Sequence, residues 1–202
     1  MGSWKDDDEK IEYDALLFRR RIGIGDDQIF IDAPTLVYKV RHFFPGVQYS
    51  LVEDAELPPP GGQWRADKRL FIFRKTIFEA ANKLNANPHA RWTLAHEVSH
   101  FANGDPGIRN RSAKGSLEKV ILPKIRRIES RTDRFTAALL APLHLIEFNE
   151  PISSIACRFG LSDEAAEIRA EEVARAYRRR HGIARPLPKS VENVLADLKK
   201  RK

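Results

Sequence analysis

One helix constrains the fold of this chain more than any other segment. Asn87-Pro88 supplies a helix N-cap followed by proline at the first helical position, and Gly104 is a natural terminator. Between them, apolar residues occupy most of the helix circumference, namely Trp92, Leu94, Ala95, Val98, Phe101 and Ala102. Such a helix is expected to cross the interior of a domain. With 202 residues and 42% hydrophobic content, the chain can form one packed domain around it.

The polar residues of this helix form the pattern His-Glu-x-x-His, at positions 96–100. Four residues are slightly more than one helical turn, so His96 and His100 project from one face and can share a metal ion. Two histidines and a glutamate on an apolar helix would be costly to bury unless they bind something. Neutral imidazole suits zinc, so we expect one zinc ion per chain, with manganese as a possible substitute.

A catalytic zinc site requires a third protein ligand. A second helix is expected from about residue 124 to residue 140, because apolar residues recur along one face, and it carries Glu129. Four residues later, Asp133 lies on the same face, where it can orient a histidine ligand without touching the metal. The alternative is that Glu129 and Asp133 only pair with neighbouring arginines of a charged helix face.

Glu97 adjoins the first histidine and is the candidate general base and acid. It can take a proton from zinc-bound water and later transfer it to a leaving amine, which makes amide hydrolysis the natural reaction class. A developing oxyanion also needs a hydrogen-bond donor. The candidates are arginines of the loop at 104–116 and five side chains, among which the sequence does not choose: His42, His89, His144, Tyr177 and His181.

The remaining pattern predicts an α+β fold, in which a small sheet of about three strands packs on the metal-bearing helices. Further helices are expected at 11–22 and after Pro34, and strands at 47–52 and 70–73, with 64–67 as a possible third. A final helical pair is expected at 152–159 and 163–180, and apolar neighbours place Cys157 in the core. We therefore divide the chain into a domain at 1–150, a helical extension packed on it at 151–182, and a basic tail at 183–202.

The net charge of +7 resides at the C-terminal end, because residues 175–202 alone sum to +8. This end could make weak contacts with nucleic acid, although a solvated tail is the simpler interpretation. No apolar run is long enough to span a membrane, and the acidic start lacks the pattern of a signal peptide. The single cysteine fits a reducing compartment, so we expect a cytoplasmic protein without membrane contact.

Two blocks of the chain resemble the ImmA/IrrE-type metallopeptidases of bacteria and their mobile elements. Residues 91–100, Arg-Trp-Thr-Leu-Ala-His-Glu-Val-Ser-His, are similar to that family's aromatic-Thr-Leu-Ala-His-Glu-Leu-Gly-His. Residues 133–142, Asp-Arg-Phe-Thr-Ala-Ala-Leu-Leu-Ala-Pro, are similar to its Asn/Asp-x-Phe-Ala-Ala-x-Leu-Leu-Met-Pro. The resemblance covers about residues 34–175, and the chain departs from the pattern at Ser99, Thr132 and Ala141.

This resemblance implies a zincin-like fold, zinc ligands at His96, His100 and Glu129, and a catalytic glutamate at Glu97. It further implies an endopeptidase that cleaves a helix-turn-helix transcriptional repressor at a limited site. In zincins the substrate commonly binds extended along a sheet edge near the metal. By that analogy, the candidate edge strand is the one before the zinc helix, formed by Leu70, Phe71, Ile72 and Phe73.

Two other functions compete with this interpretation. Residues 152–169 have the pattern of a helix-turn-helix beside a basic end, which is typical of a DNA-binding regulator. The candidate recognition helix, however, begins Asp163-Glu164 and continues with more glutamates, which would face phosphates unfavourably. The other alternative is a scaffold or sensor that binds zinc at a latent site without cleaving a partner.

Overall fold

The computed structural model describes residues 4–82, 87–105 and 116–184, without the side chains at 4–7 and 116–122. Within these ranges the fold is α+β, with seven α-helices and a three-stranded mixed sheet. None of the described helices is both long enough and apolar enough to cross a bilayer. The elements are α1 (Trp4–Arg21), α2 (Ala33–Phe43), β1 (Gln48–Val52), β2 (Gly62–Arg65), β3 (Leu70–Arg74), α3 (Lys75–Ala81), α4 (Pro88–Ala102), α5 (Ser116–Leu140), α6 (Ile152–Phe159) and α7 (Asp163–Arg180).

The sheet has the order β1-β3-β2, with β1 parallel and β2 antiparallel to β3. Phe71 and Phe73 of β3 face the same side of the sheet, because alternate residues of a strand do so, and both are fully buried. The prediction that Leu70, Phe71, Ile72 and Phe73 form the substrate-binding edge is therefore wrong. Both edges of β3 are hydrogen-bonded to neighbouring strands, and β2 and β1 are the edge strands.

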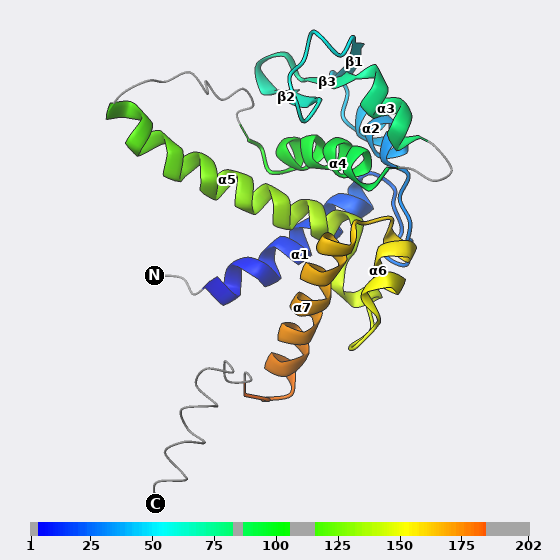
Figure 1. Ribbon diagram of the computed structural model, residues 1–202, viewed down its shortest axis with the longest axis vertical. Helices are drawn as coiled ribbons and strands as arrows, with labels where there is room; N and C mark the ends of the chain where they lie inside the picture. The colour runs from blue at the N-terminus through cyan, green and yellow to red at the C-terminus, as the bar shows by residue number, and fades with distance from the viewer. Residues whose placement is uncertain (1–3, 83–86, 106–115, 185–202) are drawn as a thin grey trace, which may run out of the picture.

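Helix α4 is the centre of the fold, as the apolar pattern predicted. It packs against β2, α2 and α3 on one side and against α5 on the other, while α1 lies against α5 (Figure 1). The side chain of Asn87 caps its start by accepting from the backbone N–H groups of His89 (2.9 Å) and Ala90 (3.3 Å). Leu94, Ala95 and Val98 are fully buried, so the histidine-bearing helix is held by packing on several sides.

Three helices differ from the sequence prediction. Helix α1 begins earlier than predicted, at Trp4, because its first turns are polar and give no apolar periodicity. Helix α5 begins earlier, at Ser116, although proline normally interrupts a helical pattern at the position it occupies. Pro123 lies inside α5. Helix α3 was not predicted, since its seven residues are too few to establish a period. The final pair, α6 and α7, has the predicted bounds.

The C-terminal helical pair is joined to the rest of the protein by buried arginines. Arg91 of α4 donates to the backbone oxygens of Phe159 and Gly160 at the end of α6 (both 3.1 Å). Arg169 of α7 reaches Ala141 O, just beyond α5. Cys157, which was predicted to be in the core, is exposed, because α6 turns only Ile155 and Phe159 inward. Residues 185–202, most of the predicted basic tail, lie outside the described residues.

Candidate metal centre

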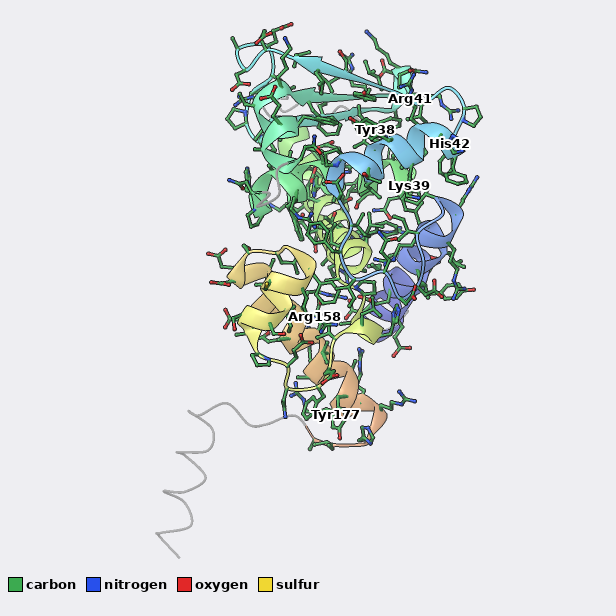
Figure 2. All side chains as sticks on the ribbon, turned by 90° about the vertical axis from the view of Figure 1, so that its right-hand side faces the viewer. Tyr38, Lys39, Arg41, His42, Arg158 and Tyr177 are labelled. Carbon is green, nitrogen blue, oxygen red and sulfur yellow. The ribbon has the colours of Figure 1, made fainter. Side chains whose placement is uncertain are left out.

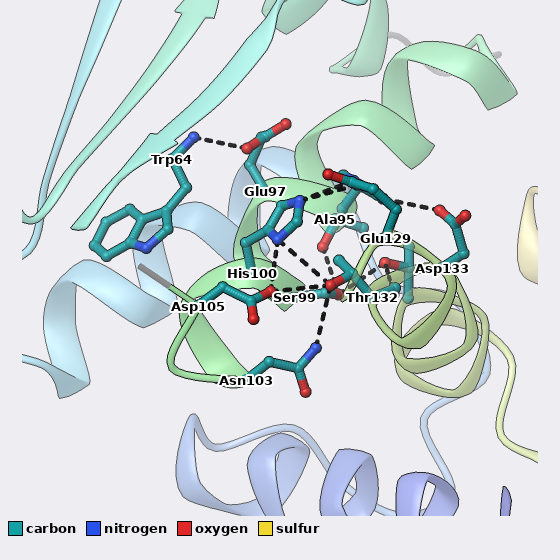
Figure 3. Close-up of polar contacts among 12 residues, drawn as sticks. Trp64, Ala95, Glu97, Ser99, His100, Asn103, Asp105, Glu129, Thr132 and Asp133 are labelled. Atoms are coloured by element: carbon teal, nitrogen blue, oxygen red, sulfur yellow. Dashed lines mark hydrogen bonds and ion pairs between the residues drawn. The ribbon is translucent and has the colours of Figure 1, made fainter. Parts of the chain in front are cut away.

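Helices α4 and α5 bring the three predicted metal ligands together. His96 Nε2 and His100 Nε2 are 3.1 Å apart, and Glu129 Oε2 lies 3.3 Å from the first and 3.5 Å from the second (Figure 3). The two imidazoles come from successive turns of α4, whereas the carboxylate comes from the helix packed across it. Two imidazoles and one carboxylate are donor types that divalent metal ions accept, and this group could hold such an ion.

The spacing of the donors also fits a tetrahedral ion. Ligands placed about 2.0–2.1 Å from a central ion at the corners of a tetrahedron are about 3.3–3.4 Å from one another. The three observed separations, from 3.1 to 3.5 Å, bracket this value. The group could therefore hold a metal ion with small movements of its side chains.

Each histidine has its own carboxylate on the ring nitrogen that faces away from the cluster. Nδ1 of His96 lies 3.1 Å from Asp133 Oδ1, within ion-pair distance but without hydrogen-bond alignment. Nδ1 of His100 lies 2.7 Å from Asp105 Oδ2, which also accepts a hydrogen bond from Thr132 Oγ1 (3.1 Å). Such carboxylates fix the tautomer and orientation of ligand imidazoles.

Asp133 was predicted in this role, but Asp105 was not. A residue just beyond a helix end gives no periodic signal, and only the turn at Gly104, with φ of +68°, brings the chain back to His100. The available signal was an acidic residue five positions after the second histidine, directly after the predicted terminator.

The carboxylates make the metal-free cluster strongly attractive to a cation. Burial lowers the pKa of His96, but Asp133, Glu129 and Glu97 outweigh burial and raise that pKa to about 9. Burial likewise lowers the pKa of His100, while Asp105 and Glu129 raise it to a net value above the ordinary one. In the metal-free protein a proton is therefore held at neutral pH where a metal ion would place its positive charge.

Glu97 is buried beside the cluster, and its carboxylate is anchored by the sheet. Its Oε2 accepts a hydrogen bond from the backbone N–H of Trp64 in β2 at 2.6 Å. Burial raises the pKa of Glu97, an effect that the nearby histidines and the Trp64 N–H partly oppose. A carboxylate with a raised pKa is better suited to accept and return a proton near neutral pH.

The contact between β2 and Glu97 depends on Gly62. A Cβ atom at this position would lie 2.8 Å from Thr93 Cγ2 and 3.0 Å from Glu97 Cγ, closer than side chains normally approach. A possible third strand was predicted at 64–67, whereas β2 begins two residues earlier, at Gly62. A glycine in a strand often marks a close backbone approach.

Two of the departures from the ImmA/IrrE pattern are hydrogen-bonded within the structure. Ser99, where that family has glycine, is fully buried and donates to Ala95 O (2.8 Å). Its hydroxyl also accepts a hydrogen bond from Thr136 Oγ1 of α5 (2.9 Å). Thr132, where that family has alanine, donates to Asp105, just beyond α4. The two departures thus add hydrogen bonds from α5 to α4 and to the turn that follows it.

Among the candidate oxyanion donors within the described residues, His89 is the one that lines a cleft together with Glu129 and Asp133. His42 and Tyr177 lie on α2 and α7, at two separate parts of the molecule (Figure 2). Tyr177 stacks between Phe148 and His181, and His144 contacts Asp26 O (2.9 Å). The loop arginines at 109 and 111 lie outside the described residues.

Comparisons with known proteins give little further information. No family model matches the chain, and no curated protein matches it. Among solved structures, a Mycobacterium tuberculosis transcriptional regulator aligns with a TM-score of 0.49 and 14% sequence identity. The alignment covers 78% of this chain and 45% of that chain. A likeness this weak transfers neither a fold nor a function.

Proposed function

We propose that this protein is a zinc-dependent endopeptidase of the ImmA/IrrE type, with a zincin-like fold. One observation carries the proposal: His96, His100 and Glu129 place three donor atoms at tetrahedral spacing beside a buried Glu97. Manganese could fill the same donor set. The resemblance of residues 91–100 and 133–142 to that family supports the proposal independently of the geometry.

His96, His100 and Glu129 would hold the ion, which when bound polarises a carbonyl and lowers the pKa of water. Glu97 then performs the proton transfers. It accepts a proton from the water whose oxygen attacks the peptide carbonyl carbon, and it donates that proton to the amine nitrogen as the C–N bond breaks. The Trp64 N–H holds the Glu97 carboxylate in position, and Asp133 and Asp105 keep the imidazoles oriented.

The edge strand β2 is the surface we propose for the substrate backbone. It is the edge strand that contacts Glu97, so a polypeptide aligned along it would lie near the proposed general base. The role assigned by analogy to Leu70, Phe71, Ile72 and Phe73 thus moves to the neighbouring strand, Gly62–Arg65. The physical argument is unchanged, because only an edge strand can accept another strand.

We propose a helix-turn-helix transcriptional repressor as the protein substrate, following the family resemblance. A repressor acts where DNA is, so this substrate implies cleavage in the cytoplasm. The DNA-binding alternative receives no support from α7, whose first turn contains the exposed acidic residues Asp163 and Glu164. The latent-scaffold alternative differs from the proposal only in the absence of cleavage.

The test is cleavage of a synthetic peptide library and of candidate repressors by zinc-loaded protein, with new N-termini identified by mass spectrometry. Glu97→Gln should retain stoichiometric zinc and lose about 10³-fold in rate, because the proton acceptor is removed and the ligands remain. Glu171→Gln, an exposed glutamate on α7 away from the metal centre, is the matched control and should behave as wild type. Zinc-loaded wild-type protein that cleaves nothing, or cleavage unaffected by Glu97→Gln, would refute the proposal.

A further inference from the structure

A cleft of about 800 Å³ opens beside the metal centre and extends to the C-terminal helical pair. One wall is α5, which contributes Ile125, Glu129, Asp133 and Ala137 at successive helical turns. The opposite wall is Leu161 together with Ala165 and Ile168 of α7. The first turns of α4 close the cleft with His89 and Trp92. The cleft therefore joins a candidate metal ligand to the C-terminal helical pair.

The lining of this cleft is suited to apolar side chains. Ile168 is 57% exposed, so more than half of a large aliphatic side chain at the wall is open to solvent. Two of the charged lining residues are already paired within the chain: Arg134 with Asp8, and Glu172 with Arg169 at 2.5 Å. These two charges need no partner from a ligand. Arg126 and Glu164 also line the cleft, but most of its lining surface is apolar, from residues such as Ile125, Leu161 and Ile168.

The position of the cleft identifies its occupant. Glu129 and Asp133 belong both to the cleft and to the metal centre, so a chain bound with its scissile bond at the metal is within reach of the cleft. A separate partner bound here would obstruct the same approach. The occupant that fits both facts is the substrate itself.

We propose that this cleft is a specificity subsite that takes a bulky aliphatic or aromatic side chain of the substrate, flanking the bond to be cleaved. The inference rests on the proposed peptidase function and adds a substrate preference to it. It also gives α7 a role, since Ile168 and Ala165 select the substrate from outside the catalytic cluster. These residues contact the substrate without contacting the reacting atoms.

The test is calorimetric titration of zinc-loaded protein with three peptide hydroxamates, which chelate zinc and need no turnover. The parent carries only glycine beside the chelating group, and the other two carry an isobutyl group on one side or the other. Burying one leucine-sized side chain should make one derivative bind about 10- to 100-fold more tightly than the parent. Ile168→Arg should reduce this ratio to below about threefold and leave the parent's affinity unchanged.

The matched control is Ile183→Arg, because Ile183 is 52% exposed and does not line the cleft. Ile183→Arg should bind the isobutyl derivative more tightly than the parent hydroxamate by the same factor as wild type. Ratios unaffected by Ile168→Arg, or isobutyl derivatives no tighter than the parent, would overturn the subsite while zinc binding and peptide cleavage still stood. Protein that binds neither zinc nor any hydroxamate would overturn the proposed function and the subsite together.

Discussion

Two clusters of charged side chains lie along α5, and their charges are paired in different ways. Near the C-terminal end of α5, Arg169 is 2% exposed and donates to Ala141 O, Glu12 Oε1 (2.8 Å) and Glu172 Oε2 (2.5 Å). In the middle of α5, Glu129 meets His96 and His100, with further carboxylates around them. In the first cluster a guanidinium is surrounded by oxygen acceptors. In the second, three potential metal-ligand atoms lie within 3.5 Å of one another.

The difference distinguishes a structural cluster from a ligand-binding one. Burying a charge is costly unless it is paired and hydrogen-bonded, and the Arg169 cluster meets that requirement within the chain. In the metal-free protein the carboxylates around the histidine cluster raise the pKa of His96 to about 9 and also raise the pKa of His100, so the cluster favours an added positive charge. We therefore expect mutations in the first cluster to affect folding and mutations in the second to affect metal binding.

The largest effect is expected at Arg169. Arg169→Met should lower the free energy of unfolding by about 3–5 kcal/mol, because Glu12, Glu172 and Ala141 O lose their buried partner. Urea denaturation measures this change, and zinc affinity of the folded protein should stay within about twofold of wild type. Arg175→Met, on the same helix but 53% exposed, should change stability by less than about 0.5 kcal/mol. Equal losses of unfolding free energy in the two variants would show that Arg169 has no special structural role.

The next effect is expected at Asp105, the carboxylate beside His100. Asp105→Asn should weaken zinc binding by about 10- to 100-fold, because His100 loses the acceptor at Nδ1 that fixes its orientation. Competition with a chromogenic chelator measures this affinity, and the unfolding free energy of metal-free protein serves as a second readout. Asp67→Asn is the control, since Asp67 is 59% exposed and lies in the segment between β2 and β3. Unchanged zinc affinity in Asp105→Asn would show that Asp105 does not position the ligand.

A smaller effect is expected where β2 approaches α4. Gly62→Ala should lower the cleavage rate and destabilise the fold by about 1–3 kcal/mol, because the added methyl group meets Thr93 and Glu97. Thr93→Ser removes the methyl group that lies 2.8 Å from the new Cβ, and it keeps the hydroxyl that bonds to His89 O. The double variant should recover part of both losses. Full activity in Gly62→Ala would mean that β2 need not hold Glu97 closely.

The smallest effect is a pH dependence confined to the metal-free protein. The folded-state pKa of His96 is about 9, above its ordinary value of about 6.5, so its proton stabilises the fold fully below pH 6.5 and that stabilisation is lost as pH rises through 9. We expect a loss of about 1–2 kcal/mol, because Asp133 is half exposed and solvent weakens the pair. Zinc-loaded protein, with a neutral His96, should lack this loss, as should metal-free His96→Gln. Denaturation curves at a series of pH values test both expectations.

Features set by local signals were predictable from the sequence, whereas features set by contacts between distant segments were not. Helix α4 and its two histidines were predictable because a cap, a terminator and a period of four residues are local signals. Glu129 and Asp133 were predictable because they repeat that spacing on a second helix. The order of the strands was not, since pairing of β3 with both β1 and β2 depends on contacts between distant segments. Asp105 lies close to His100, and Gly62 lies close to Thr93 and Glu97. Such isolated contacts produce no periodic pattern in the sequence.

The most direct test of the central claim is the metal content of purified protein after dialysis against metal-free buffer and back-titration with zinc. Elemental analysis should find one zinc per chain in wild type, in Glu97→Gln and in Arg175→Met. It should find about none in His96→Ala or Glu129→Ala, whose metal-free forms should remain folded by circular dichroism. Zinc that is absent from wild type, or that persists at full stoichiometry in both ligand variants, would contradict the account.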